Sequence, residues 1–486
     1  MINFGFWNLI IVIVVALVLK NNWRLDDAEK AVWKNSLFLK YSAIQWLMQF
    51  FRQPIVNFIV QAFVVLVVTR FLCYTGWLVY FLNQPNPPLW DFKWFYVASK
   101  LAHQHLSPFN VEIFNQAFCT LTKACGFIPP FVYPPNIIPI IWFLGYFPIN
   151  TAFTIWIAMH IFAIGLALWA ANILLESKSL ALRTICTISA ALIYGLVRDL
   201  QVANIAILVA VLILWMFILA RKYQDIPAGL CLGIALFKPT LAALFILYFL
   251  LKRRFYLVIV SVVTGAFLVF LGLALTDNSL TQFLADASRG FPLWLKDPSN
   301  SPYLSITRLD LMVLGPRFFP NNPLIAKFFS DLVVLILVGF VGWYWYLQQS
   351  LTTWSKTIYL TEMVLVSCLS IAINYSQQTS TVMLIPAVVF LLNDLLYQIR
   401  YCRFYLKRIS IWLAGVCSLA VQTAVIHGWL IGSLANRWNV KAGELPYIMK
   451  VTIFALPSYA ILAITVSILF LAISSLHQKQ NTLEAD

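Results

Sequence analysis

Long apolar runs recur along the 486-residue chain, with short polar segments between them. A helix needs about 20 apolar residues to cross the hydrocarbon of a bilayer. The pattern therefore predicts an all-α, polytopic membrane protein with about eleven spanning helices and further re-entrant or short helices. The expected crossings are residues 2–19, 55–82, 151–175, 180–197, 205–220, 255–276, 328–347, 358–373, 379–396, 409–426 and 448–475. The first of these lacks the basic start and small-residue exit of a cleaved signal, so it is interpreted as a retained segment that is either a spanning helix or an anchor.

Two apolar stretches do not fit a single crossing. Residues 136–148 are too short to span, so they are expected to be re-entrant or interfacial. Residues 226–251 have basic segments on both sides, so both ends should lie on one side of the membrane. The stretch is too short to cross twice, which predicts a hairpin of two short helices with Lys238-Pro239-Thr240 at its tip. Lys238 should then point into a cavity at membrane depth, since a broken helix is tolerated only there.

An amphipathic stretch, residues 89–110, follows three prolines that end the preceding apolar run. It carries an early carboxylate, Asp91, which should lie at the outer membrane face. Aromatic side chains surround this carboxylate: Trp90, Phe92, Trp94, Phe95 and Tyr96. Such a face suits chemistry on a sugar carried by a lipid, and the alternative role for Asp91 is capping of the following helix.

Composition supports the membrane class and narrows the partners. The chain is 62% hydrophobic and only 10% charged, with a mean hydropathy of +0.84, which excludes a soluble protein of this size. The net charge of +15 does not indicate nucleic-acid binding, because the basic residues lie in short loops, as the positive-inside rule predicts. Large loops are expected outside, at 83–130, 277–326 and 427–447, so the substrate should be extracytoplasmic and the plasma membrane of a bacterium is the expected location.

The chain divides by pattern into three parts. Residues 1–54 are expected to be an N-terminal helix and a cytoplasmic segment, either amphipathic or a solvated linker. Residues 55–400 form the membrane core, and residues 401–486 hold C-terminal helices and a cytoplasmic tail. Of eight cysteines, Cys119 and Cys125 share a predicted outer loop, where they either form a disulfide or remain free thiols. Nucleotide-binding, dinucleotide-binding and zinc-protease motifs are absent from the sequence, and neither a metal nor a cofactor is expected.

Four motifs, in this order along residues 75–400, resemble those of glycosyltransferase family 87. Asp91-Phe92 with Tyr96, Ala98 and Ser107-Pro108-Phe109 resembles the element DFxxYYxA…GxxPY. Tyr133-Pro134-Pro135 resembles the element FxYPP. Gln201 with Asn204 resembles GQxN, and Gly229, Gly233 and Lys238-Pro239-Thr240 resemble AGxxxGxxxxxKPT. Where the family often carries a tryptophan and a histidine, this chain has Gln377 and Gln378, either of which is expected to take that polar role.

The resemblance implies a helical membrane bundle of the GT-C type with a catalytic cavity outside the cytoplasm. It implies a donor sugar on a polyprenyl phosphate and places the catalytic carboxylate on Asp91. The expected reaction moves a hexose, with mannose the expected sugar, to a lipid or glycan acceptor. A lipid phosphate is already a good leaving group, so one base suffices and inversion at the anomeric carbon follows.

The remaining candidate residues have a functional role and a structural alternative. Lys238, then Arg70 and Arg198, are expected to balance the donor phosphate, with Arg289 and Arg308 as weaker candidates. The alternatives are a paired structural lysine, a snorkelling Arg70, and an Arg198 paired with Asp199. Gln201 and Asn204 are candidates for binding sugar hydroxyls, although Asn204 also suits a helix cap. Tyr96 and Tyr133 either stack on the sugar or are ordinary interfacial tyrosines.

Two other functions fit part of the pattern. A transporter or lipid flippase explains the intramembrane cations and the broken hairpin, but does not explain the large aromatic outer loops with an early carboxylate. A non-catalytic assembly subunit is the third alternative. The sequence does not identify the sugar, the acceptor, the linkage or the oligomeric state.

Overall fold

The computed structural model describes residues 90–125, 128–175, 180–297, 300–303, 305, 308–349, 356–400, 406–422 and 455–483. All named elements within these residues are helical, and one isolated bridge, between Arg308 and Gln377, pairs backbone as strands do. The predicted all-α class is therefore confirmed for the described residues. Predictions for residues 1–89, among them Arg70 and the first two crossings, lie outside them.

The elements in chain order are α5 (Trp90–His103), α6 (Val111–Thr122), η2 (Pro135–Ile137), α7 (Ile138–Ile141), η3 (Trp142–Tyr146), α8 (Ile149–Leu174), α9 (Leu180–Ala191), α10 (Tyr194–Val202), α11 (Ala206–Arg221), α12 (Asp225–Ala235), α13 (Pro239–Leu251), α14 (Phe255–Leu275), α15 (Leu280–Trp294), η4 (Leu311–Val313), α16 (Leu314–Phe318), α17 (Pro323–Gln349), α18 (Lys356–Ile373), η5 (Gln378–Leu384), α19 (Ile385–Arg400), α20 (Leu406–Val421) and α23 (Leu456–Leu483).

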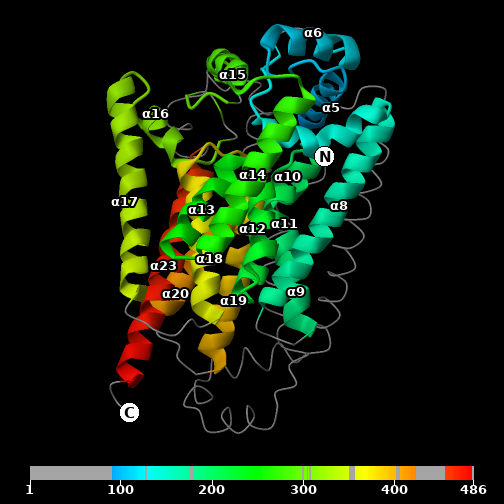
Figure 1. Cartoon of the computed structure of the whole chain (residues 1–486). Coiled ribbons are helices and arrows are strands. Elements are labelled where there is room, and N and C mark those ends of the chain that lie inside the picture. The colour runs from blue at the N-terminus through cyan, green and yellow to red at the C-terminus, as the bar shows by residue number, and fades with distance from the viewer. Residues whose placement is uncertain are drawn as a thin grey trace, which may run out of the picture.

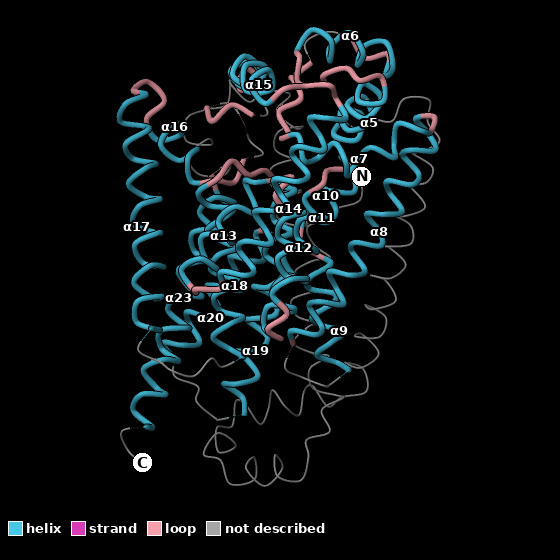
Figure 2. Tube along the Cα trace, viewed as in Figure 1, coloured by secondary structure: helices cyan, strands magenta, loops and turns pink. Residues whose placement is uncertain are grey.

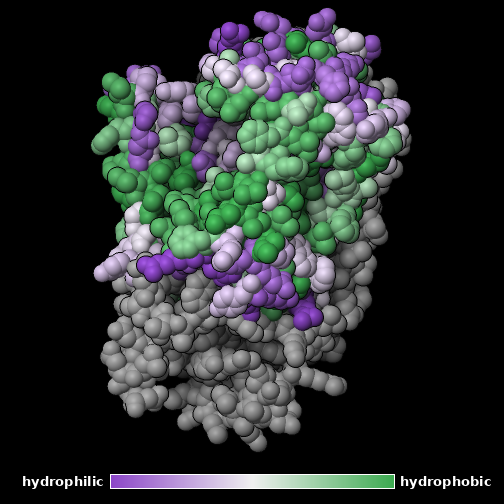
Figure 3. All heavy atoms as spheres, in the orientation of Figure 1, coloured by the Kyte–Doolittle hydropathy of each residue, from purple (hydrophilic) through white to green (hydrophobic). Residues whose placement is uncertain are grey.

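Four of the described helices, α8, α14, α17 and α23, are long and apolar enough to cross a membrane. They run roughly along one direction (Figure 1). A band of hydrophobic side chains covers the middle of the visible face, with hydrophilic side chains above and below it (Figure 3). Exposed apolar side chains on α14 and α17, such as Phe267 and Phe328, suit contact with lipid tails rather than water. The protein is therefore a membrane protein, while the full number of crossings and the GT-C arrangement stay predictions.

The predicted hairpin of residues 226–251 is confirmed as α12 followed by α13. The guanidinium of Arg254, just after α13, donates to the carboxylate of Asp225 at the start of α12, so the two ends meet. Gly233 lies against α14 so closely that a Cβ there would be 2.6 Å from Cβ of Thr264. The tip, Lys238, lies at the far end of the hairpin and points into the site described below.

The predicted crossing at residues 180–197 is wrong in detail, because the helix is broken. Helix α9 ends at Ala191 and α10 begins at Tyr194. Tertiary contacts hold the break: the backbone N–H of Tyr194 donates to the carbonyl of Gln422, and that of Gly195 donates to Oγ1 of Thr381. The absent side chain of Gly195 allows this approach, since a Cβ would lie 2.6 Å from Thr381.

Helices replace most of the first predicted outer loop. Helices α5, α6 and α15 and the short elements η2, α7 and η3 gather at one end of the bundle, where the described loops are also concentrated (Figures 1 and 2). The predicted short stretch 136–148 indeed forms only short elements. Cys119 and Cys125 form a disulfide in this layer. We call this end of the molecule the site end.

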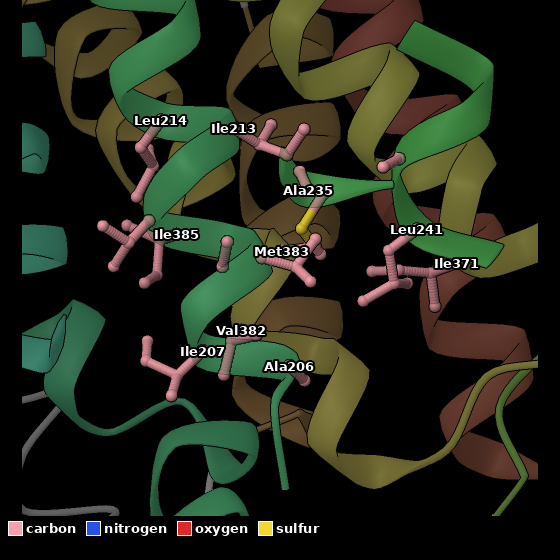
Figure 4. Close-up of a cluster of buried hydrophobic side chains, with 14 of the residues drawn as sticks. Ala206, Ile207, Ile213, Leu214, Ala235, Leu241, Ile371, Val382, Met383 and Ile385 are labelled. Carbon is pink, nitrogen blue, oxygen red and sulfur yellow. The ribbon is translucent and has the colours of Figure 1, made fainter. Parts of the chain in front are cut away.

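A hydrophobic core lies directly beneath the site end. Side chains of α11, α12, α13, α18, η5 and α19 meet there (Figure 4). The cluster includes Ala206 and Ile207, which lie only two and three positions after Asn204 in the chain. The polar site is thus attached to the packed interior, which limits its movement.

Candidate active site

Asn204 lies between a carboxylate and an ammonium group that come from distant parts of the chain. Its Nδ2 donates to Oδ2 of Asp91 over 2.6 Å. Its Oδ1 accepts from Nζ of Lys238 over 2.8 Å. One amide therefore bridges Asp91, in the first turn of α5, and Lys238, at the tip of the α12–α13 hairpin.

Burial and the neighbouring groups act on the pKa of Asp91 in opposite directions. Burial raises the pKa of the Asp91 carboxyl above its ordinary value, while the hydrogen bond from Asn204 and the charges of Lys238 and Arg198 lower it. Helix α5 is not one of the spanning helices. A carboxylate with a raised pKa beside a cation is a suitable proton acceptor.

Tyr133 completes this centre from the loop before η2. Its hydroxyl lies 3.4 Å from Nδ2 of Asn204, and burial followed by the Asp91 charge raises its pKa well above the ordinary value. The Tyr133 ring packs edge-on against Phe95 of α5, with centroids 5.1 Å apart. Gly272 of α14 allows this segment to pack closely, since a Cβ there would be 2.0 Å from the carbonyl oxygen of Pro135.

The backbone of residues 203–204 sets the direction of the Asn204 amide. Ala203 ends α10 with φ 56°, a left-handed conformation that costs a non-glycine residue energy. Two contacts compensate: the Trp156 indole of α8 donates to the carbonyl of Ala203 over 3.0 Å, and the Asn204 N–H donates to the carbonyl of Asp199 within α10. Oδ1 of Asn204 also accepts from the N–H of Ala206, so the capping role expected as an alternative occurs together with the bridge.

Arg198 lies near the centre but does not pair with Asp199. Its Nη1 donates to Oε1 of Gln201 over 3.4 Å, and its charge reaches Asp91. Asp199 is fully buried and accepts from the N–H of Ile207 over 2.9 Å. The carboxylate of Asp199 also interacts electrostatically with Lys238. Gln201, by its contact with Arg198, belongs to the same face of α10.

Two further candidates are buried side chains. Tyr96 is buried within α5, and its hydroxyl donates to the carbonyl of Phe147 over 3.2 Å. It therefore holds α5 against the segment before α8 and does not join the group around Asp91. Gln378 is buried at the start of η5.

Gln377 belongs to a second polar network at the site end. Its Nε2 and the Tyr375 hydroxyl both donate to Oδ1 of Asn300. The Arg308 guanidinium lies 4.9 Å from the Tyr375 ring and makes a bidentate ion pair with Asp310. Arg308 is thereby engaged, in contrast to the phosphate-binding role considered for it. Asp91 interacts electrostatically with Tyr375, so this network faces the same centre.

Sequence reasoning missed Trp156, His160, Asp199 and Tyr375 as members of the site. His160 and Trp156 lie one helical turn apart on α8, and both contact the 203–204 segment. The presence of a histidine in an otherwise apolar run could have identified His160 and its neighbour Trp156, because polar side chains in spanning helices normally face a partner. In the described part of the chain, no three His, Cys, Asp or Glu side chains gather where they would hold a metal ion.

These features define a class: a polytopic helical membrane protein with a buried polar centre at one end of its bundle. The family model of glycosyltransferase family 87 matches residues 131–368. This match over residues 131–368 confirms the resemblance and indicates a membrane glycosyltransferase. Tyr133, Asn204 and Lys238 lie within the match, whereas Asp91 precedes it. Comparisons with curated proteins and with solved structures gave no match.

Proposed function

We propose that this protein transfers a hexose, with mannose as the expected sugar, from a polyprenyl-phosphate donor to a lipid or glycan acceptor outside the cytoplasm. Asp91 is the general base of an inverting transfer. The observation that supports the proposal is the Asn204 bridge, which holds a carboxylate and an ammonium group on either side of one amide.

The reaction needs two opposite charges at neighbouring points. The acceptor hydroxyl oxygen forms a bond to the anomeric carbon, its proton passes to Asp91, and the bond from the anomeric carbon to the phosphate oxygen breaks. The electron pair of that bond leaves with the polyprenyl phosphate, whose charge Lys238 balances. An ammonium group has three donors, and Asn204 is its one hydrogen-bond acceptor among the described residues.

The Asn204 bridge also keeps the two charges from neutralising one another. A direct contact between Asp91 and Lys238 would hold both in an ion pair and reduce their availability to substrates. Through the amide, each charged group keeps a fixed position and a free side. Arg198 supplies further positive charge near the centre, and Gln201, Tyr133 and Gln377 are the proposed partners of sugar hydroxyls.

Membranes containing the protein, incubated with a panel of radiolabelled polyprenyl-phosphate sugars, test this proposal. We expect Asp91→Asn to lower the initial rate of glycoside formation about 100-fold or more, as loss of a general base does. Asp277→Asn is the matched control, because Asp277 is an exposed carboxylate at the site end and its φ of 46° suits asparagine.

Unchanged product formation by the Asp91→Asn protein would remove Asp91 from the mechanism. Translocation of the labelled lipid without any glycoside formed would instead support the transporter or flippase alternative. Both substituted proteins are compared at equal amounts of folded protein, measured by size-exclusion chromatography in detergent.

A further inference from the structure

His160 of α8 is buried with both ring nitrogens facing oxygen atoms. Nδ1 lies 2.8 Å from the carbonyl oxygen of Trp156, one turn earlier in the helix. Nε2 lies 2.5 Å from the carbonyl oxygen of Asn204. A carbonyl oxygen only accepts, so each nitrogen must carry a hydrogen for both contacts to be attractive.

We propose that His160 is a positioning residue held as an imidazolium ion, which fixes the backbone of Asn204 and thereby the bridge between Asp91 and Lys238. A neutral imidazole carries one N–H. It would leave a lone pair facing a carbonyl at hydrogen-bond distance, which is repulsive in a buried site.

Two features of the surroundings reduce the cost of burying this charge. The Asp199 carboxylate supplies the counter-charge, with Oδ2 at 3.8 Å from Nε2, and hydrogen bonds from a charged donor are stronger than neutral ones. The other oxygen of Asp199, Oδ1, is buried and has no hydrogen-bond partner among the described residues. The further charged or titratable groups near this unit are Asp91, Lys238 and Tyr133, all of which surround Asn204.

His160 lies where a charged hydrogen-bond donor stabilises the backbone next to the site. His160 holds the carbonyl of Asn204, and Trp156 holds the carbonyl of Ala203. Two adjacent carbonyls at a left-handed turn are thus held by one face of α8. Because the backbone of Asn204 is fixed, its side-chain Nδ2 is held near Asp91 and its Oδ1 near Lys238.

Nitrogen-15 NMR of the histidine rings tests the protonation state without any assay of activity. The sample is the full chain in detergent micelles at pH 8, with His103, His427 and His477 replaced by glutamine and His105 by asparagine, so that His160 alone gives imidazole signals. We expect both ring nitrogens to give protonated-type shifts. A pyridine-type shift from either nitrogen overturns the inference.

Asp199→Asn in the same background keeps an acceptor for the Ile207 N–H but removes the counter-charge. We expect this variant to show a pyridine-type nitrogen at the same pH. Two protonated nitrogens that persist in Asp199→Asn would mean that Asp199 is not the group that holds the charge.

The kinetic arm rests on the proposed function. We expect His160→Gln, which has one donor nitrogen where the imidazolium has two, to lower kcat about 10-fold while the donor KM changes less than about 2-fold, because substrate contacts remain but the bridge shifts. His105→Asn, an exposed site with φ 56°, is the control. An unchanged kcat contradicts the positioning role. Absence of sugar transfer by the wild-type protein would refute the proposed function alone, since the NMR result stands independently.

Discussion

At the scale of single residues, Asn204 links three segments that are far apart in the sequence. Its side chain contacts Asp91 and Lys238, and its carbonyl contacts His160. A buried amide has two donors and two acceptor lone pairs, so it is able to satisfy several partners at once. An apolar side chain of similar size would leave the charges of Asp91 and Lys238 without this bridge.

Asn204→Leu is therefore expected to lower the transfer rate about 10- to 100-fold, the range typical for supporting residues at an active site. The physical reason is that Asp91 and Lys238 lose their common partner and move relative to one another. Initial rates with a saturating donor measure the effect. Asn278→Leu is the control, since Asn278 also donates to a side chain at the site end, Ser107, but lies outside the centre. Equal rates for the two variants would contradict the role of the bridge.

The pH dependence of transfer should follow the ionisation of Asp91. As a base, Asp91 acts only when ionised, and burial raises its pKa above the ordinary value. Activity is therefore expected to be full above this raised pKa and to fall as the pH decreases through it. The Arg198 charge lowers the same pKa, so Arg198→Gln should move the acidic limb of kcat/KM to higher pH.

The matched control for that shift is Arg289→Gln, which removes an exposed arginine from α15. A profile of Arg198→Gln that coincides with that of Arg289→Gln would show that Arg198 does not act on the base. A change in the donor KM alone, without a shift of the limb, would assign Arg198 to phosphate binding only.

At the scale of elements, the α12–α13 hairpin and α14 act as one packed unit. Gly229 and Gly233 lie one turn apart on α12, and a Cβ at either would meet Val260 or Thr264 of α14 at less than 3.0 Å. The salt bridge between Arg254 and Asp225 closes the other end of the hairpin. This close packing carries Lys238 to the depth of Asn204, so a change in helix packing should affect the site.

Gly233→Ala is expected to destabilise the protein by about 1–3 kcal/mol, because one added methyl group overlaps Thr264 and the carbonyl of Ser261. Gly165→Ala on α8 is the control, since no other described part of the chain comes within 4 Å of its ideal Cβ. Alanine there should be neutral or slightly stabilising. Thermal unfolding in detergent, followed by circular dichroism, measures both. Equal melting temperatures for the two variants would mean that α12 and α14 are not in close contact.

At the scale of the whole molecule, the site end and the basic turns lie at opposite ends of the described bundle. Helix α11 leads from Asn204, in the site, to Arg221 and Lys222, and α13 leads from Lys238 to Lys252 and Arg254. The hydrophobic band between two hydrophilic belts separates these ends (Figure 3). With basic residues expected in the cytoplasm, the site should face the opposite compartment.

Cysteine labelling of intact cells tests this orientation with a matched pair. Gln104 follows α5 at the site end, Gln224 follows the basic turn after α11, and both are exposed. In a background with the exposed Cys417 replaced, an impermeant maleimide should label Gln104→Cys from outside. It should label Gln224→Cys only after the membrane is opened. The reverse pattern would place the site in the cytoplasm.

The broad architecture was predictable because its causes are local. Apolar length identified the spanning helices α8, α14 and α17, and charge on both sides of residues 226–251 indicated the hairpin. The break between α9 and α10 was not predictable, since it depends on contacts of Tyr194 and Gly195 with residues about 200 positions away. The site was predictable in part: Asp91, Asn204 and Lys238 come together as expected, whereas Tyr96 faces Phe147.

By itself, the sequence determined the membrane class, the hairpin with Lys238 at its tip and the amphipathic helix that carries Asp91. These follow from hydrophobic length and charge, which act over neighbouring residues. Only the tertiary structure decided that Asn204 bridges the two charges, and that His160, Trp156 and Asp199 hold the backbone around it. Those contacts join elements that are distant in the chain, so no local pattern of residues encodes their distances.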